Sequence, residues 1–180
     1  LGCVVEVGSA VTEFWPGDVV MIPPYAGTWR QQVIVSARHI RLKFPPQEKV
    51  PKGIHRQLAM LMANPPTAWL LLNSLASLAP GDWIVQNAAN SAVGQYVMQL
   101  AHLYGLKTVN VVRRDNLSDL VTHSRGDVCL IDGNDLADQV SEATGNRDVC
   151  LAIDAVAGGA TQRLANCLRD GSTVVNYGLL

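Results

Sequence analysis

Residues 83–94 read Trp-Ile-Val-Gln-Asn-Ala-Ala-Asn-Ser-Ala-Val-Gly, and this stretch decides the fold. Its apolar start predicts a buried strand, its small residues predict a tight turn, and its end opens a run with helical periodicity. Turns that bind a pyrophosphate have this strand–turn–helix order, with glycine at three positions. Those positions hold Ala89, Ser91 and Gly94, so only the third glycine is kept. Taken alone, the stretch leaves a purely structural turn open.

Downstream of this stretch, predicted strands and helices alternate, which indicates a parallel sheet with crossover helices on both faces. The strands are expected at 83–87, 108–112, 128–131, 149–153 and 172–176, and the helices at 92–104, 116–124, 134–144 and 159–168. The predicted fold class is α/β, with a Rossmann-type doubly wound parallel sheet that has five of its six strands.

Upstream, residues 1 to about 45 are rich in short β segments and turns, which favours a β-barrel-like unit. Strands are expected at 4–7, 19–22, 32–35 and 40–42, followed by helices at 55–62 and 67–78. Asn64, Pro65 and Pro66 are expected to stop the first helix and to form a rigid non-helical link. The chain starts in a strand-like run and ends just after an apolar one, so we expect an internal piece of a longer protein.

The composition is that of a globular chain, with 48% hydrophobic residues, 16% charged residues and a formal net charge of -1. This charge balance argues against a nucleic-acid partner. The apolar runs are too short to span a bilayer, so no membrane partner is expected. The four cysteines lie far apart and the four histidines are isolated, so buried free thiols and no metal site are predicted.

The second strand of the predicted sheet ends in Arg113 and Arg114, where a site that prefers NAD usually has an acid. Paired guanidinium groups suit a 2′-phosphate, which offers charge and several acceptor oxygens. Asp115 could act as the acid, but it lies one or two residues late, and two solvated arginines are the alternative. The pattern favours NADPH as the cofactor.

Together these segments resemble the medium-chain dehydrogenase/reductase superfamily. Residues 2–8 with 16–20 are similar to its catalytic-domain strands, and Pro80-Gly81-Asp82 before the first nucleotide strand is typical of it. The resemblance is greatest to the mitochondrial-type trans-2-enoyl-thioester reductases and covers nearly the whole chain. The supporting segments are Gly-Thr-Trp-Arg at 27–30, Asn-Pro-Pro-Thr-Ala at 64–68, residues 86–95, and Asn-Val-Val-Arg-Arg at 110–114.

The resemblance implies a partial GroES-like catalytic domain at 1–65 and an NADP-binding Rossmann domain, C-terminally incomplete, at 66–180. It implies that Asn64 contacts the nicotinamide end and that Tyr177 and Gly178 flank the nicotinamide ribose. Residues 90–93 would contact the pyrophosphate, and the two arginines the 2′-phosphate. The expected cofactor-binding residues are Asn64, Ala89, Asn90, Ser91, Ala92, Val93, Gly94, Arg113, Arg114, Asp115, Tyr177 and Gly178.

The activity implied by the resemblance is a zinc-free, NADPH-dependent reduction of the C2–C3 double bond of enoyl thioesters, as in fatty-acid synthesis. The tyrosine that assists protonation in the family lies upstream of residue 1, so no catalytic residue is expected here and this chain alone is expected to be inactive. The substrate would be carried by coenzyme A or an acyl carrier protein, and the full-length protein would be a homodimer. A cytoplasmic location is expected, or a mitochondrial one in a eukaryote.

Two other functions stay open. One is an NADPH-dependent quinone or alkenal reductase of the same superfamily, with the same cofactor and a different substrate cleft. The other is a non-catalytic nucleotide-binding fragment without turnover.

Overall fold

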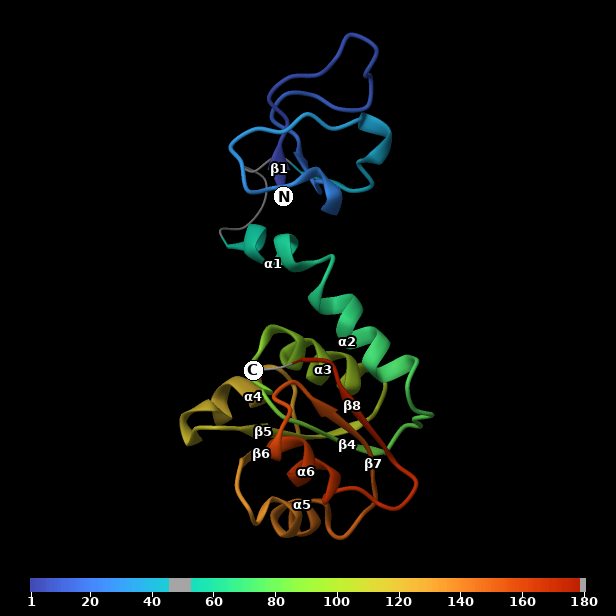
Figure 1. Ribbon diagram of the computed structural model, residues 1–180, viewed down its shortest axis with the longest axis vertical. Helices are drawn as coiled ribbons and strands as arrows, with labels where there is room; N and C mark the ends of the chain where they lie inside the picture. Colours follow the sequence, from blue (N-terminus) through green and yellow to red (C-terminus); the bar gives the residue numbers. More distant parts are fainter. Residues whose placement is uncertain (46–52, 179–180) are drawn as a thin grey trace. The chain divides into compact units, whose positions relative to one another are not determined.

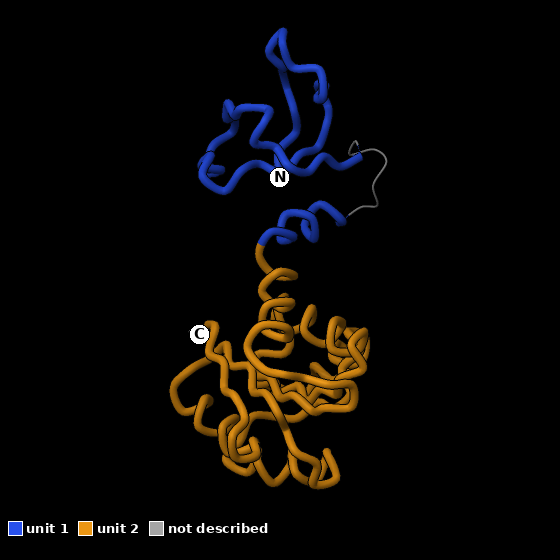
Figure 2. The backbone as a smooth tube through the Cα atoms, turned by 90° about the vertical axis from the view of Figure 1, so that its right-hand side faces the viewer, with its two compact units in different colours: residues 1–62 blue, residues 63–180 orange. Residues whose placement is uncertain are grey.

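The computed structural model describes residues 1–45 and 53–178, and the chain divides into two compact units, Leu1–Met62 and Ala63–Leu180 (Figure 2). None of the helices in the described residues is both long enough and apolar enough to cross a membrane.

A five-stranded parallel sheet forms the centre of the second unit. Its strands are β4 (Trp83–Gln86), β5 (Lys107–Val112), β6 (Val128–Ile131), β7 (Val149–Asp154) and β8 (Thr173–Asn176). In space they lie in the order β6-β5-β4-β7-β8, so the chain first adds strands on one side of β4 and then on the other. This order confirms the predicted doubly wound sheet with five of the six strands of a full fold.

Helices cover both faces of this sheet (Figure 1). On one face α2 (Asn64–Asn73) and α3 (Ala92–Leu103) pack on Ile84, Leu151 and Ile153, and α4 (Ser118–His123) extends this layer. On the other face α5 (Leu136–Thr144) and α6 (Gly159–Ala165) pack on Val85 and Ala152. Successive residues of a strand point to opposite faces, so strands buried on both sides need continuous apolar runs.

The start of α2 corrects the sequence prediction. Asn64, Pro65 and Pro66 form the first turn of the helix and not a non-helical link, and the helix ends at Asn73, earlier than expected. The first amides of a helix have no intrahelical acceptor, so prolines lose nothing there, and their fixed φ suits the helix. The first regular bond is donated by the Thr67 amide to the Ala63 carbonyl, at 3.0 Å.

The first unit has less regular structure than predicted. Its sheet consists of β1 (Gly2–Cys3), β2 (Val19–Val20) and β3 (Lys43–Phe44), all antiparallel. The described residues of this unit also form the short helices η1 (Pro24–Ala26), η2 (Ala37–His39) and α1 (Ile54–Met60). The strands expected at 4–7, 32–35 and 40–42 are wrong. Val5 is 70% exposed and Ile34 fully exposed, and β-branched residues favour a strand only where neighbours cover them.

Candidate nucleotide-binding site

The candidate site lies at the carboxyl ends of β4 and β7, where the strand order reverses. These neighbours are parallel, and the helices that follow them leave toward opposite faces of the sheet. The loops after the two strands therefore leave in opposite directions above the strand ends. Open α/β sheets bind ligands in the crevice outside the strand ends at this point.

The turn after β4 is anchored to both neighbouring strands. The Asn87 amide donates to the Ile153 carbonyl of β7 at 3.1 Å, and the Ala89 amide donates to the Val111 carbonyl of β5 at 3.3 Å. Between them Ala88 has a φ of 46°, in the left-handed region that costs an L-residue roughly 1–2 kcal/mol. The two backbone hydrogen bonds thus hold Ala88 in a conformation that glycine adopts without strain.

Ser91 caps the start of α3. Its hydroxyl accepts the Gly94 amide at 3.1 Å and its carbonyl accepts the Gln95 amide at 3.0 Å. Within the described residues, no partner is seen for the amides of Ala92 and Val93, which begin the helix. Free amides and the positive end of the helix dipole favour an anion at this place.

Gly94 is required by backbone crowding. A Cβ at this position would lie 2.6 Å from the carbonyl oxygen of Ala89, which belongs to the turn itself. The glycine therefore lets the first turn of α3 pack directly on the turn that precedes it, which keeps the helix start close to the strand ends.

A buried polar ladder holds the first turn of α3 against the sheet. The side-chain amide of Gln86 donates to the Gly94 carbonyl at 3.1 Å and to the Asn110 side chain at 2.8 Å. Asn110 in turn donates to the Val128 carbonyl at 3.0 Å, so the ladder joins α3 to β4, β5 and β6. This ladder was not predicted from the sequence, although two amide side chains within apolar strands were a signal for it.

The buried carboxylate of Asp154, the last residue of β7, was not predicted from the sequence either. One of its oxygens accepts the Asn87 side-chain amide at 2.5 Å, and the other accepts the Asn176 amide at 3.1 Å. Asn87 also accepts the Ala155 amide at 2.7 Å, so its side chain is not free to bind a phosphate. The remaining donors to Asp154 are the Val156 and Ala157 amides and the Thr161 hydroxyl.

These contacts set the protonation state of Asp154. Burial alone raises the pKa of this carboxyl, but hydrogen bonds from Thr161, Asn87 and two backbone amides together hold the pKa well below its usual range. The carboxylate is therefore charged at neutral pH. An ionised oxygen accepts stronger hydrogen bonds than a neutral one, so the charge tightens the crevice.

We expect Asp154→Asn to lower the melting temperature at neutral pH by about 5 °C, because it weakens charge-assisted hydrogen bonds. Since the folded pKa is depressed, the carboxylate stabilises the fold above its unfolded pKa of about 3.9 and loses this effect as the pH falls through the folded pKa. The variant should therefore lose less stability than the wild type between pH 5 and about 3. Melting curves across this range test it, with the exposed Asp170→Asn as control. Equal acid sensitivity of Asp154→Asn and wild type would contradict the assignment.

The end of β8 brings Tyr177 and Gly178 to the same crevice. The Tyr177 amide donates to the Asp154 carbonyl at 2.9 Å, and its hydroxyl shares a hydrogen bond with the Ser91 side chain. Burial raises the pKa of this phenol, the bond with Ser91 lowers it, and the charge of Asp154 raises it further. A Cβ at Gly178 would lie 2.9 Å from the Ala155 carbonyl oxygen, so the chain passes close above β7.

Arg113, Arg114 and Asp115 lie beyond the end of β5, on the other side of β4. Both arginines are exposed, and Asp115 begins the short helix η4 (Asp115–Leu117). In the part of the chain that the structure describes, no ion pair or hydrogen bond engages either guanidinium group. Both groups are therefore available to an anion.

Asn64 is the candidate that the structure does not join to the others. It opens α2 and is half-buried, and within the described residues its side chain makes no hydrogen bond to the crevice. Asn90 is exposed in the turn, where its carbonyl accepts the Gln95 side-chain amide at 3.1 Å.

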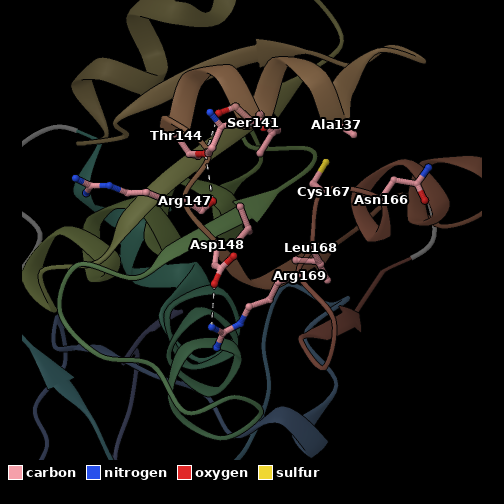
Figure 3. A pocket seen from close by; sticks show the side chains of 12 residues that line it. Ala137, Ser141, Thr144, Arg147, Asp148, Asn166, Cys167, Leu168 and Arg169 are labelled. Atoms are coloured by element: carbon pink, nitrogen blue, oxygen red, sulfur yellow. Dashed lines mark hydrogen bonds and ion pairs between the residues drawn. The ribbon is translucent and has the colours of Figure 1, made fainter.

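A separate cavity of about 230 Å³ lies at the opposite edge of the sheet, by the amino end of β7 (Figure 3). Arg169 pairs there with Asp148 at 3.2 Å, and burial raises the pKa of the Cys167 thiol to about 11. None of the candidate residues lines this cavity.

Metal ligands do not gather anywhere in residues 1–45 and 53–178, where no group of three or more His, Cys, Asp or Glu side chains could hold an ion. The four cysteines are free thiols, but Cys3 is exposed and the other three are only partly buried, so the prediction that they are buried is wrong.

Known proteins are similar to this chain over nearly its whole length, although no family model matches it. The mitochondrial enoyl-[acyl-carrier-protein] reductase of Caenorhabditis elegans is 37% identical over an alignment of 182 positions, which covers 98% of this chain and 50% of that protein. The chain spans about half the length of the curated relatives it matches.

Solved structures share the fold as well. The mitochondrial 2-enoyl thioester reductase Etr1p/Etr2p heterodimer of Candida tropicalis has a TM-score of 0.78 at 28% identity, and the complex of Etr1p with NADP and crotonyl-CoA has 0.78 at 27%. Both comparisons cover 98% of this chain and 53% of the other. A putative NADPH:quinone reductase from Bacillus thuringiensis has a TM-score of 0.77 at 28% identity and covers 99% and 53%.

Proposed function

We propose that this chain is the cofactor-binding part of an NADPH-dependent reductase of enoyl thioesters, because nearly all of it is similar to the mitochondrial enoyl-[acyl-carrier-protein] reductases. The observation that supports this most is a pairing of two anion-binding features. Ser91 caps a helix start whose first amides have no partner among the described residues, and two arginines without an ion pair there follow the neighbouring strand.

The residues of the crevice fit NADPH. The pyrophosphate would lie against the Ala92 and Val93 amides, close to the sheet because Gly94 has no side chain. Arg113 and Arg114 would hold the 2′-phosphate by bidentate, charge-assisted hydrogen bonds, and Asp115 would lie at the rim of this pocket.

The two halves of the cofactor would then lie on the two sides of β4. The adenosine half would lie toward β5, where the arginines are, and the nicotinamide half would extend over β7 and β8. Tyr177 and Gly178 end β8 and would flank the nicotinamide ribose. Asn64 would contact the nicotinamide from the start of α2.

When bound there, NADPH would supply the hydride for the C3 carbon of the enoyl thioester. The residues of this chain bind and orient the cofactor, and the buried crevice floor excludes water from beneath it. No residue of this chain is proposed as the proton donor, and the site is proposed to work without zinc.

The proposal extends to the organisation of the whole protein. Residues 1–65 would be part of a GroES-like catalytic domain and residues 66–180 the NADP-binding domain. The substrate would be a thioester of coenzyme A or of an acyl carrier protein, and two copies of the full-length protein would form the active dimer. The location would be mitochondrial in a eukaryote and cytoplasmic otherwise.

The activity is tested on the protein expressed from its whole coding sequence. We expect NADPH to be oxidised with crotonyl-CoA and with longer enoyl thioesters on coenzyme A or acyl carrier protein. With quinones kcat/KM should be at least about tenfold lower, which corresponds to about 1.4 kcal/mol of transition-state discrimination. NADPH absorbance measures both. No oxidation with any enoyl thioester would refute the proposed activity.

A quinone or alkenal reductase is the second candidate, because the putative quinone reductase of Bacillus thuringiensis shares the fold over nearly the whole chain. Faster turnover of quinones than of enoyl thioesters would favour it. Binding of NADPH by the 180-residue chain with no turnover of any acceptor would favour a non-catalytic nucleotide-binding fragment.

A further inference from the structure

The floor of the crevice holds a negative charge that no positive group balances. Asp154 is fully buried at the end of β7, and its donors are amides and one hydroxyl, all of them neutral. Within the described residues, no lysine, arginine or histidine forms an ion pair with it. Neutral donors stabilise a carboxylate without cancelling its net charge, and burial lets its field extend farther than it would in water.

This charge lies on the nicotinamide side of the crevice. The Asp154 carbonyl accepts the Tyr177 amide, and its carboxylate accepts the Asn176 side chain, so the group sits between the ends of β7 and β8. Under the proposed function, on which this step rests, these strand ends underlie the nicotinamide half of the cofactor.

We propose that the buried carboxylate of Asp154 acts through its field on the nicotinamide ring and makes the site favour NADP⁺ over NADPH. The ring carries a positive charge in NADP⁺ and none in NADPH, so a nearby negative charge lowers the free energy of the oxidised form alone. Positive charge also develops on the ring while it gives up hydride, so the same field helps the forward reaction. Asp154 does not touch the ring, so it is a positioning and electrostatic residue.

The expected effect is measurable. Unit charges about 10–15 Å apart, at an effective dielectric constant of about 20, change a binding ratio by about fivefold to fifteenfold. Asp154→Asn keeps the shape of the side chain and removes the charge. It should therefore raise the ratio of the Kd for NADP⁺ to the Kd for NADPH by about fivefold or more. Fluorescence titration of NADPH and calorimetric titration of NADP⁺ give the two constants without any turnover.

Thr161→Val is the matched control. It removes a hydrogen bond to Asp154 and keeps the charge, so both dissociation constants should change by the same factor and their ratio should not. A purely structural role of Asp154 predicts this parallel change for Asp154→Asn as well.

A second variant decides the question if Asp154→Asn does not fold. Asn176 is exposed, and its side chain lies 3.1 Å from the carboxylate, so Asn176→Lys places a cation beside Asp154 on the surface. This variant should raise the ratio in the same direction, whereas Asn176→Met should leave it unchanged. An unchanged ratio in Asn176→Lys, or in folded Asp154→Asn, overturns the inference. A wild-type protein that binds neither nucleotide overturns the proposed function and this inference with it, whereas binding with an unchanged ratio overturns this inference alone.

Discussion

Replacing Arg113 and Arg114 together with alanine is expected to weaken NADPH binding about 100-fold and to leave NADH binding unchanged. Both side chains are exposed and unpaired in the described structure, so their removal costs no fold stability. Each hydrogen bond to a charged phosphate contributes about 1.5 kcal/mol at the low end of its range, and two such losses amount to about 100-fold in Kd. NADH lacks the 2′-phosphate and so loses nothing.

The matched control removes the same charge from the opposite edge of the sheet. Arg147→Ala with Arg169→Ala changes the net charge equally, at the cavity shown in Figure 3. This control should bind NADPH like the wild type, because distant exposed charges are screened at physiological salt. Fluorescence titration of both nucleotides measures the difference. An equal loss of NADPH and NADH affinity in the Arg113 and Arg114 variant would show that the arginines do not read the 2′-phosphate.

Gly94→Ala should destabilise the protein by about 2 kcal/mol and weaken NADPH binding at least about tenfold. Alanine normally stabilises a helix relative to glycine by about 1 kcal/mol, so a loss is diagnostic of crowding. The added Cβ would lie 2.6 Å from the Ala89 carbonyl oxygen, and the turn or the start of α3 must move apart to admit it. That movement displaces the Ala92 and Val93 amides from the pyrophosphate.

Gly159→Ala is the control for this substitution. Gly159 begins α6, and a Cβ there would meet only the flexible end of Arg163, at 3.5 Å. The control should therefore be as stable as the wild type or slightly more stable. Thermal melting and NADPH titration of both variants make the comparison. Wild-type stability of Gly94→Ala would mean that the turn relaxes freely and that glycine is not needed there.

The parallel sheet could be predicted from the sequence because its strands are buried on both faces. Val109 and Val111 face one helix layer and Val112 the other, so the strand needs an uninterrupted apolar run. Such apolar runs between turn residues are a local pattern, so the strands can be recognised from the sequence alone. In the first unit the short apolar segments near Val5 and Ile34 have no covering layer, and the same residue types gave a wrong prediction.

Two other features were predicted wrongly or not at all, for different physical reasons. Proline breaks a helix interior but suits a first turn, so Asn64-Pro65-Pro66 could either end one helix or begin the next, and the structure shows that it begins α2. Asp154 was missed because its partner Asn87 is 67 positions away in the sequence, and only the order of the strands brings them together. Its signal was a single carboxylate that ends an apolar strand.

The bond between Asn87 and Asp154 also limits how this crevice can change during evolution. The turn after β4 lacks two of the glycines that usually let such a turn adopt its shape. The side chain of Asn87 instead fixes the turn by hydrogen bonds to Asp154 and to the Ala155 amide. A change at either residue alone leaves a buried polar group without its partner, which costs about 1–3 kcal/mol. The two positions are therefore energetically coupled, and sequences that lose one should lose the other in the same step or regain glycine in the turn.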